Sequence, residues 1–126
     1  MVSNVEIMVV EDVKEDMKLI KYHLKRMGFP NVIEANDGDT ALQLLNHSKV
    51  DLIIADRYMP NMDGLVLFQK LQENEKLKDI PFLMTTAEHE KEKIIDAMKL
   101  GISNYIIKPI DPENLESKVK RLLNVE

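Results

Sequence analysis

The segment Leu52-Ile53-Ile54-Ala55-Asp56 joins a short apolar run directly to a carboxylate. Short apolar runs without alternation, rich in β-branched residues, are typical of strands buried on both faces of a parallel sheet. Three other runs have this form, and each ends close to a polar residue: Ile7–Val10 before Glu11 and Asp12, Phe82–Met84 before Thr86, and Tyr105–Ile107 before Lys108. Ligands of open α/β sheets bind outside the carboxyl ends of the strands. We therefore expect these polar groups to meet at one sheet edge, as a site for a metal ion and a phosphoryl group.

Helical patterns separate these runs, so that strand and helix alternate five times along the chain. The first helical stripe has a period near 3.6 and ends at Gly28; it consists of Val13, Met17, Ile20, Leu24 and Met27. The alternation predicts an α/β fold, a doubly wound five-stranded parallel sheet with helices on both faces. A dinucleotide site would need a glycine-rich turn after the first strand. In this chain the turn reads Glu11-Asp12-Val13-Lys14 and contains no glycine, which excludes a dinucleotide site.

The remaining elements follow from apolar spacing and from turn residues. The other strands are expected at Asn31–Ala35, at Val50–Ala55, from Pro81 to Thr86, and at Ser103–Ile107. Further helices are expected to pack through Ala41, Leu42 and Leu45, through Leu65, Phe68 and Leu71, and over Glu88–Leu100. Asp111 and Pro112 are expected to begin a last helix that docks through Leu115, Val119 and Leu122.

Length and composition predict one domain over residues 1–126 in a protein of the cytoplasm. The chain has no cysteine, which fits a reducing compartment, and residues 1–6 lack the pattern of a signal peptide. No apolar run approaches the roughly 20 residues of a membrane span. The net charge of −5 argues against nucleic acid as a partner. Four lysines of the first helix have the spacing of a solvated face: Lys14, Lys18, Lys21 and Lys25.

Taken together, the strand-end motifs resemble the receiver domain of two-component response regulators. The motifs are Glu11-Asp12, Asp56 with Met59-Pro60-Asn61-Met62-Asp63-Gly64, Thr86-Ala87, and Tyr105-Ile106-Ile107-Lys108-Pro109. Within the family, the chain is most similar to chemotaxis regulators of the CheY type, through Leu24–Phe29, Glu34–Gly38 and Leu83–Glu88. The resemblance covers essentially the whole chain. It implies the flavodoxin-like, CheY-like strand order 2-1-3-4-5.

The resemblance also implies a role for each residue of the site. Asp12 and Asp56 are expected to ligate Mg²⁺ directly, with the backbone carbonyl of Tyr58 as a third ligand and Glu11 acting through water. Asp56 is then the nucleophile that takes a phosphoryl group from a histidine kinase. Thr86 and Lys108 are expected to contact that group, and the Lys108–Pro109 bond is expected to be cis. Glu11 stands where the family more often has Asp.

The output implied by the resemblance is a switch in a surface formed by helix 4, strand 5 and helix 5. Tyr105 is expected to move inward when Thr86 moves toward the phosphoryl group, and the surface includes Ile94 and Lys118. The expected partner is a downstream protein such as a flagellar switch protein, bound by a monomer with no membrane contact. The protein is expected not to be an enzyme beyond its own phosphorylation and dephosphorylation.

Several alternatives stay open at this point. Taken singly, Asp12 and Thr86 are ordinary helix caps, and Lys108 is an ordinary surface lysine. A receiver with these residues also suits a phosphorelay intermediate or a module of a larger regulator. A degenerate receiver that acts as a scaffold is a further alternative, but the complete set of site residues speaks against it: Asp12, Asp56, Thr86 and Lys108. A phosphatase of the haloacid dehalogenase type shares the Asp nucleophile but needs a second acid two residues later, where this chain has Tyr58. The bulk of Tyr58 predicts slow hydrolysis of the phosphoryl group, because it shields the group from water.

Overall fold

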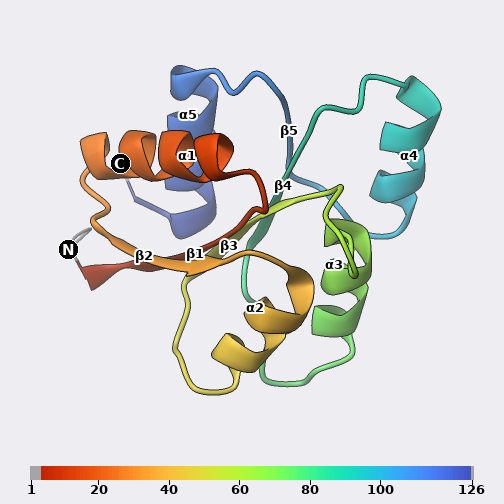
Figure 1. Cartoon of the computed structure of the whole chain (residues 1–126), viewed down its shortest axis with the longest axis horizontal. Coiled ribbons are helices and arrows are strands. Elements are labelled where there is room, and N and C mark those ends of the chain that lie inside the picture. Colours follow the sequence, from red (N-terminus) through yellow and green to blue (C-terminus); the bar gives the residue numbers. More distant parts are fainter. Residues whose placement is uncertain (1–3, 126) are drawn as a thin grey trace.

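A computed structural model describes residues 4–125 and contains one parallel five-stranded sheet in the order β2-β1-β3-β4-β5 (Figure 1). The strands are β1 (Glu6–Val10), β2 (Asn31–Ala35), β3 (Leu52–Asp56), β4 (Phe82–Thr86) and β5 (Tyr105–Ile107). The helices are α1 (Lys14–Arg26), α2 (Gly38–Leu45), α3 (Gly64–Gln72), α4 (Lys91–Lys99) and α5 (Pro112–Leu123). The predicted fold and strand order are confirmed. Residues 1–3, expected to carry no leader, and residue 126, the expected end of the domain, lie outside the described residues.

The central strands are buried on both faces, as their unalternated apolar sequences predict. Every residue of β3 and β4 is buried, and so is every residue of β1 after Glu6. β3 begins at Leu52 instead of Val50, because Asp51 ends the preceding loop: its amide donates to the Glu6 carbonyl (2.8 Å) and its carboxylate accepts from the Glu6 amide (2.8 Å). β5 is shorter than expected and begins at Tyr105.

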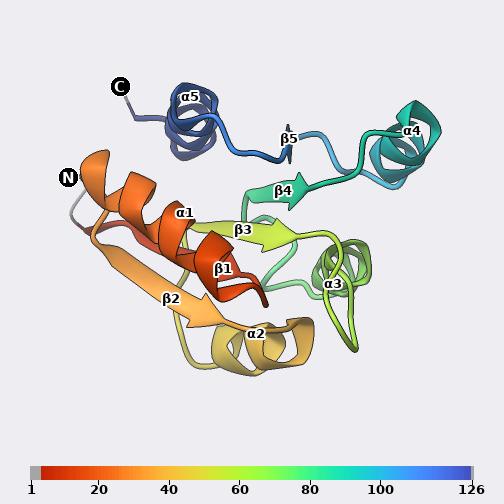
Figure 2. The ribbon, with the colours of Figure 1, turned by 45° about the horizontal axis from the view of Figure 1, so that its top comes forward.

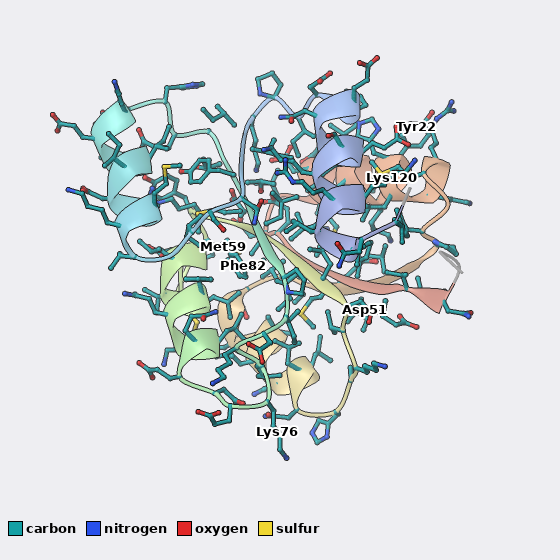
Figure 3. The ribbon with its side chains drawn as sticks, turned by 180° about the vertical axis from the view of Figure 1, so that it is seen from behind. Tyr22, Asp51, Met59, Lys76, Phe82 and Lys120 are labelled. Atoms are coloured by element: carbon teal, nitrogen blue, oxygen red, sulfur yellow. The ribbon has the colours of Figure 1, made fainter. Side chains whose placement is uncertain are left out.

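Helices cover both faces of the sheet and enclose two cores (Figure 2). One core, which we call the α1/α5 core, packs Met17, Ile20 and Leu24 of α1 with Leu115 and Val119 of α5 against the sheet. The other, the α2/α3 core, contains residues of α2 and α3 and only Ala97 from α4. Met59 and Phe82, labelled in Figure 3, belong to the α2/α3 core, where the Phe82 ring meets the Phe68 ring edge-on at 5.2 Å. Leu67 is fully buried there, although the expected stripe of α3 omitted it.

Three aspartates cap helices, but neither of the strand-end residues that were candidate caps does so. Asp37, Asp63 and Asp111 each accept a hydrogen bond from the amide three residues later. The N-cap of α1 is Val13, a residue that is 42% exposed, so its expected place in the apolar stripe is wrong. The N-cap of α4 is Glu90, so the helix begins later than the expected Glu88.

Glycine ends two of the helices where the sequence predicts it. Gly28 and Gly101 have φ values of 96° and 110°, in the left-handed region that glycine enters without steric cost. Among residues 4–125, no helix combines the length and the apolar character needed to cross a bilayer.

Candidate functional site

The sheet delivers the strand-end residues to one edge. Each of three strands continues its ladder by one further backbone hydrogen bond: Glu11 to the Ala35 carbonyl (3.0 Å), Arg57 to the Thr85 carbonyl (2.8 Å), and Lys108 to the Thr86 carbonyl (2.7 Å). These bonds fix the backbone positions from which the side chains of the site project. The Lys108–Pro109 peptide bond is cis, as expected.

Three carboxylates gather at this edge. Glu11, Asp12 and Asp56 each place one oxygen so that all three oxygens lie within 4.8 Å of one another. Glu11 and Asp56 are buried, whereas Asp12 is exposed to solvent. Like charges at such distances repel by roughly 3–4 kcal/mol per pair at an effective dielectric near 20. Hard, anionic oxygens with an open side toward solvent are suited to hold a divalent cation such as Mg²⁺.

Lys108 is the cation that the site itself supplies. Its ammonium donates to Glu11 Oε1 (2.9 Å) and Asp16 Oδ2 (2.8 Å) and lies 3.4 Å from Asp56 Oδ1. Its side chain is only 16% exposed. Three carboxylates therefore surround one ammonium, and Asp12 adds a fourth negative charge to the cluster. The excess negative charge is a second reason why the site suits a divalent cation.

The two central groups have shifted pKa values. Burial first, and then the charge of Glu11, raise the pKa of Asp56 to about 6 against the opposing effect of Lys108. Burial alone lowers the pKa of Lys108, but its hydrogen bonds to Asp16 and Glu11 outweigh burial, so the pKa rises. At neutral pH Asp56 is thus mostly ionised and Lys108 fully protonated.

The loop after Asp56 turns back tightly toward the strand. A Cβ at Gly64 would overlap the Asp56 carbonyl oxygen, so only glycine fits there. The Gly64 amide donates to the Arg57 carbonyl (2.7 Å), and Asn61 takes a φ of 70° within the turn. Among residues 4–125, the Tyr58 carbonyl accepts no hydrogen bond, so it is available as a ligand.

Thr86 lies at the end of the strand next to Asp56 and is fully buried. Its hydroxyl accepts a hydrogen bond from the Glu88 amide (3.0 Å). Within the described chain, no hydrogen bond joins Thr86 to Asp56. The structure thus brings Asp12, Asp56 and Lys108 into one cluster and leaves the Thr86 hydroxyl engaged with the loop before α4.

Two side chains directly after Asp56 connect the site to α4 and β5. Tyr58 is 46% exposed, and its hydroxyl donates to Glu88 Oε2 (2.8 Å). Arg57 is 8% exposed, and its Nη1 donates to the Lys93 carbonyl (3.0 Å) and the Tyr105 hydroxyl (3.3 Å). A shallow hollow beside Tyr58 is lined by Ala87, Glu88, His89 and Glu90.

The three residues of the expected output surface lie on the expected elements. Ile94, on α4, and Tyr105, on β5, are half-buried, and Tyr105 packs against the α2/α3 core. Lys118 is half-buried on α5. α4 and α5 flank β5 on either side (Figure 1).

Sequence reasoning missed Asp16 as a residue that contacts the site, and it did not predict the burial and contacts of Arg57. Asp16, in the first turn of α1, has the ordinary appearance of an acid that favours a helix N-terminus, yet it pairs with Lys108. Arg57 is buried, and the only indication of this in the sequence is its position between Asp56, at the end of a buried strand, and the turn that follows. Neither contact follows from spacing, because both depend on how separate elements pack.

Comparison with known proteins identifies the family. Residues 7–120 match the response regulator receiver domain. The chain is 36% identical to the chemotaxis protein CheY of Pseudomonas aeruginosa, over 93% of this chain and 94% of that protein. It is 38% identical to a chemotaxis protein CheY homolog of Campylobacter jejuni, over 94% of this chain and 92% of the homolog.

Among solved structures, it is similar to the signal receiver domain of a signal transduction histidine kinase from Syntrophus aciditrophicus. The two share 32% identity at a TM-score of 0.88, over 95% of this chain and 90% of that one. Homology to CheY proteins and other response regulators supports phosphorylation-dependent signalling in chemotaxis. The chain therefore belongs to the response regulator receiver domain family, whose members are signalling proteins and not enzymes in the usual sense.

Proposed function

We propose that Asp56 accepts a phosphoryl group from a histidine kinase and that Thr86 and Lys108 contact that group. The observation that supports this most strongly is the position of Asp56. Its buried carboxylate lies 3.4 Å from the Lys108 ammonium and belongs to a cluster of three carboxylates that suits a divalent cation. A carboxylate in such a place is both ionised and next to the positive charge that phosphoryl transfer requires.

The transfer exchanges one bond to phosphorus for another. An Asp56 oxygen forms the new P–O bond, the P–N bond to the donor imidazole breaks, and its electron pair returns to that nitrogen, which takes up a proton from solvent. Lys108 neutralises charge on the phosphoryl oxygens. Hydrolysis reverses the modification: water attacks phosphorus and releases inorganic phosphate and the Asp56 carboxylate.

Mg²⁺ is the cation that best fits the donor set. Asp12 and Asp56 would hold it, with the Tyr58 carbonyl as a third ligand and Glu11 acting through water. When bound, Mg²⁺ supplies countercharge to the phosphoryl oxygens. The Lys108 ammonium donates to Glu11 and Asp16 and lies 3.4 Å from Asp56 Oδ1, close enough to contact a phosphoryl group on Asp56.

The switch begins at Thr86. In the unphosphorylated protein the Thr86 hydroxyl accepts from the Glu88 amide. A phosphoryl group on Asp56 offers this hydroxyl an anionic acceptor, and movement toward it changes the α4–β5–α5 surface that carries Ile94, Tyr105 and Lys118. A local charge event thus biases an element with two arrangements.

The first experiment measures phosphoryl incorporation. Incubation with acetyl phosphate and Mg²⁺ should add one phosphoryl group by intact mass, and the chelator EDTA should prevent it. Asp56→Asn should abolish the addition, whereas the control Asp79→Asn should not, because Asp79 precedes β4 at the opposite edge of the sheet. Equal labelling of wild type and Asp56→Asn would exclude Asp56 as the acceptor.

The second experiment tests the partner. We expect residues 1–126 to act as a single domain and a monomer in the cytoplasm, binding a flagellar switch protein when phosphorylated. A fluorescent peptide from such a protein should bind on the order of tenfold more tightly when Mg²⁺ and beryllium trifluoride, a phosphoryl analogue, occupy the site. Equal affinity with and without the analogue would exclude this output.

A second candidate function is a receiver that passes its phosphoryl group to another histidine, alone or within a larger regulator. The similarity to a receiver domain of a histidine kinase favours it. Transfer from the phosphorylated protein to a histidine phosphotransfer domain would distinguish it from the first. The haloacid dehalogenase alternative does not fit, because Tyr58 stands where the second acid is needed and the family is that of receivers.

A further inference from the structure

The Arg57 side chain is buried between the proposed site and the proposed output surface. It follows Asp56 directly at the end of β3, and only 8% of the residue is exposed. A guanidinium stays protonated under all ordinary conditions, so its burial requires partners for its N–H groups. Those partners show which parts of the molecule it holds together.

Arg57 joins two elements that have few other links. Its Nη1 donates to the Lys93 carbonyl in the first turn of α4 and to the Tyr105 hydroxyl on β5, at 3.0 Å and 3.3 Å. We call these two hydrogen bonds the Arg57 bridge. The Arg57 guanidinium also lies 5.3 Å from the centre of the Tyr58 ring, so the bridge contacts the loop that follows the site.

The position of α4 depends on the Arg57 bridge because α4 buries fewer of its own residues than the other helices do. Ala97 is its one buried residue, whereas Ile95 and Met98 are 37% and 53% exposed. α1, by contrast, buries Met17, Ile20 and Leu24. Because α4 buries little apolar area, the hydrogen bond from a buried charged donor to its Lys93 carbonyl is a large part of what fixes its position. The second hydrogen bond of Arg57 ties that donor to β5.

We propose that Arg57 is a positioning residue that holds α4 and Tyr105 in the unphosphorylated arrangement through the Arg57 bridge. This inference rests on the proposed function of Asp56 and deepens it. Displacement of the Tyr105 ring from its present position takes its hydroxyl away from Arg57 Nη1, so the bridge opposes a switch that moves Tyr105. Removing the bridge therefore raises the population of the switched arrangement and, by linkage, the affinity of the site for a phosphoryl analogue.

The test uses Arg57→Met in the full chain, which keeps much of the aliphatic stem and removes the donors. Hydrogen–deuterium exchange of the α4 amides should become roughly tenfold faster without phosphorylation. Fluorine NMR of protein carrying 3-fluorotyrosine should show the Tyr105 signal displaced toward its position in wild type loaded with beryllium trifluoride and Mg²⁺. The apparent affinity for beryllium trifluoride should rise several-fold.

The chain offers a matched control. Arg26 donates from Nη1 to the Tyr22 hydroxyl (3.3 Å) and lies 5.7 Å from the Tyr22 ring centre, so it repeats both kinds of contact. Tyr22 lies on α1, at the side of the molecule away from α4 (Figure 3). Arg26→Met should leave α4 exchange, the Tyr105 signal and analogue affinity unchanged.

A second variant covers the case in which Arg57→Met folds poorly. Tyr105→Phe removes only the acceptor hydroxyl, so α4 exchange and analogue affinity should change in the same direction by a smaller factor. Folded variants with wild-type α4 exchange overturn the proposal. The proposal is also overturned if α4 exchange becomes faster while the Tyr105 signal and the analogue affinity stay as in wild type. Arg57 would then contribute to stability alone.

Failure of the two proposals can be told apart. If beryllium trifluoride neither binds wild type nor moves its Tyr105 signal, the proposed function of Asp56 fails, and the bridge has no switch to oppose. If wild type responds and Arg57→Met behaves like wild type, the Arg57 bridge fails and the function of Asp56 stands.

Discussion

At the scale of single residues, the surroundings of Asp56 disfavour the ionised form of its carboxyl group. Its pKa of about 6 in the folded, metal-free protein exceeds the ordinary value of 3.8. Between these two pH values the folded state binds the proton more tightly than the unfolded chain does. The stability that depends on Asp56 therefore falls as pH rises through this window and stays at the lower level above it.

Asp56→Asn removes this effect. In EDTA at pH 7, the substitution should raise the free energy of unfolding by about 1–2 kcal/mol, a figure reduced to allow for solvent screening. The gain should shrink as pH falls toward 4, because wild-type Asp56 is then protonated in the fold. Urea denaturation at several pH values measures it; a gain that is equal at pH 4.5 and pH 7 would contradict the assignment.

Tyr58 is expected to control how long the phosphoryl group lasts. Tyr58 stands two residues after Asp56, and its hydroxyl is held by a hydrogen bond to Glu88. We expect its ring to cover one side of the approach to Asp56. Tyr58→Asn should shorten the phosphoryl lifetime several-fold, because a smaller side chain admits water. Tyr58→Phe is the matched control, since it keeps the ring and loses the hydroxyl. Loss of radiolabel from purified phosphoprotein gives the rates, and equal lifetimes for wild type and Tyr58→Asn would refute the shielding role.

At the scale of elements, α4 differs from the other helices in how little of it is buried. The same substitution placed on two helices makes the difference measurable. Met17→Ala on α1, where Met17 is 5% exposed, should lower the free energy of unfolding by about 2–5 kcal/mol. Met98→Ala on α4, where Met98 is 53% exposed, should change it by no more than about 0.5 kcal/mol. Similar losses from both variants would show that α4 is as firmly packed as α1.

The elements could largely be predicted from the sequence, and the exceptions have physical causes. Apolar runs and helical stripes predict all five strands and all five helices, because burial on one or two faces dictates those patterns. Element ends were less predictable. Val13 became an exposed cap, and α4 began at Lys91, because capping and loop geometry depend on contacts made after folding.

At the scale of the whole molecule, the order of the strands brings the site together. β1 and β3 are neighbours, so the acids at their carboxyl ends meet, and β4 and β5 bring Thr86 and Lys108 to the same edge. Strand-end motifs and family resemblance together predict this set of residues. They did not predict Asp16, which reaches Lys108 from α1, or the Arg57 bridge to α4, because each contact joins elements distant in sequence.

The central claim is that Asp56 carries the phosphoryl group, and chemical trapping tests it most directly. Borohydride reduces an acyl phosphate of aspartate to homoserine, which peptide mass spectrometry locates in the sequence. After reaction with acetyl phosphate and Mg²⁺, homoserine should appear at position 56 alone. Homoserine at another aspartate, or a phosphoryl group found on a histidine instead, would contradict the account.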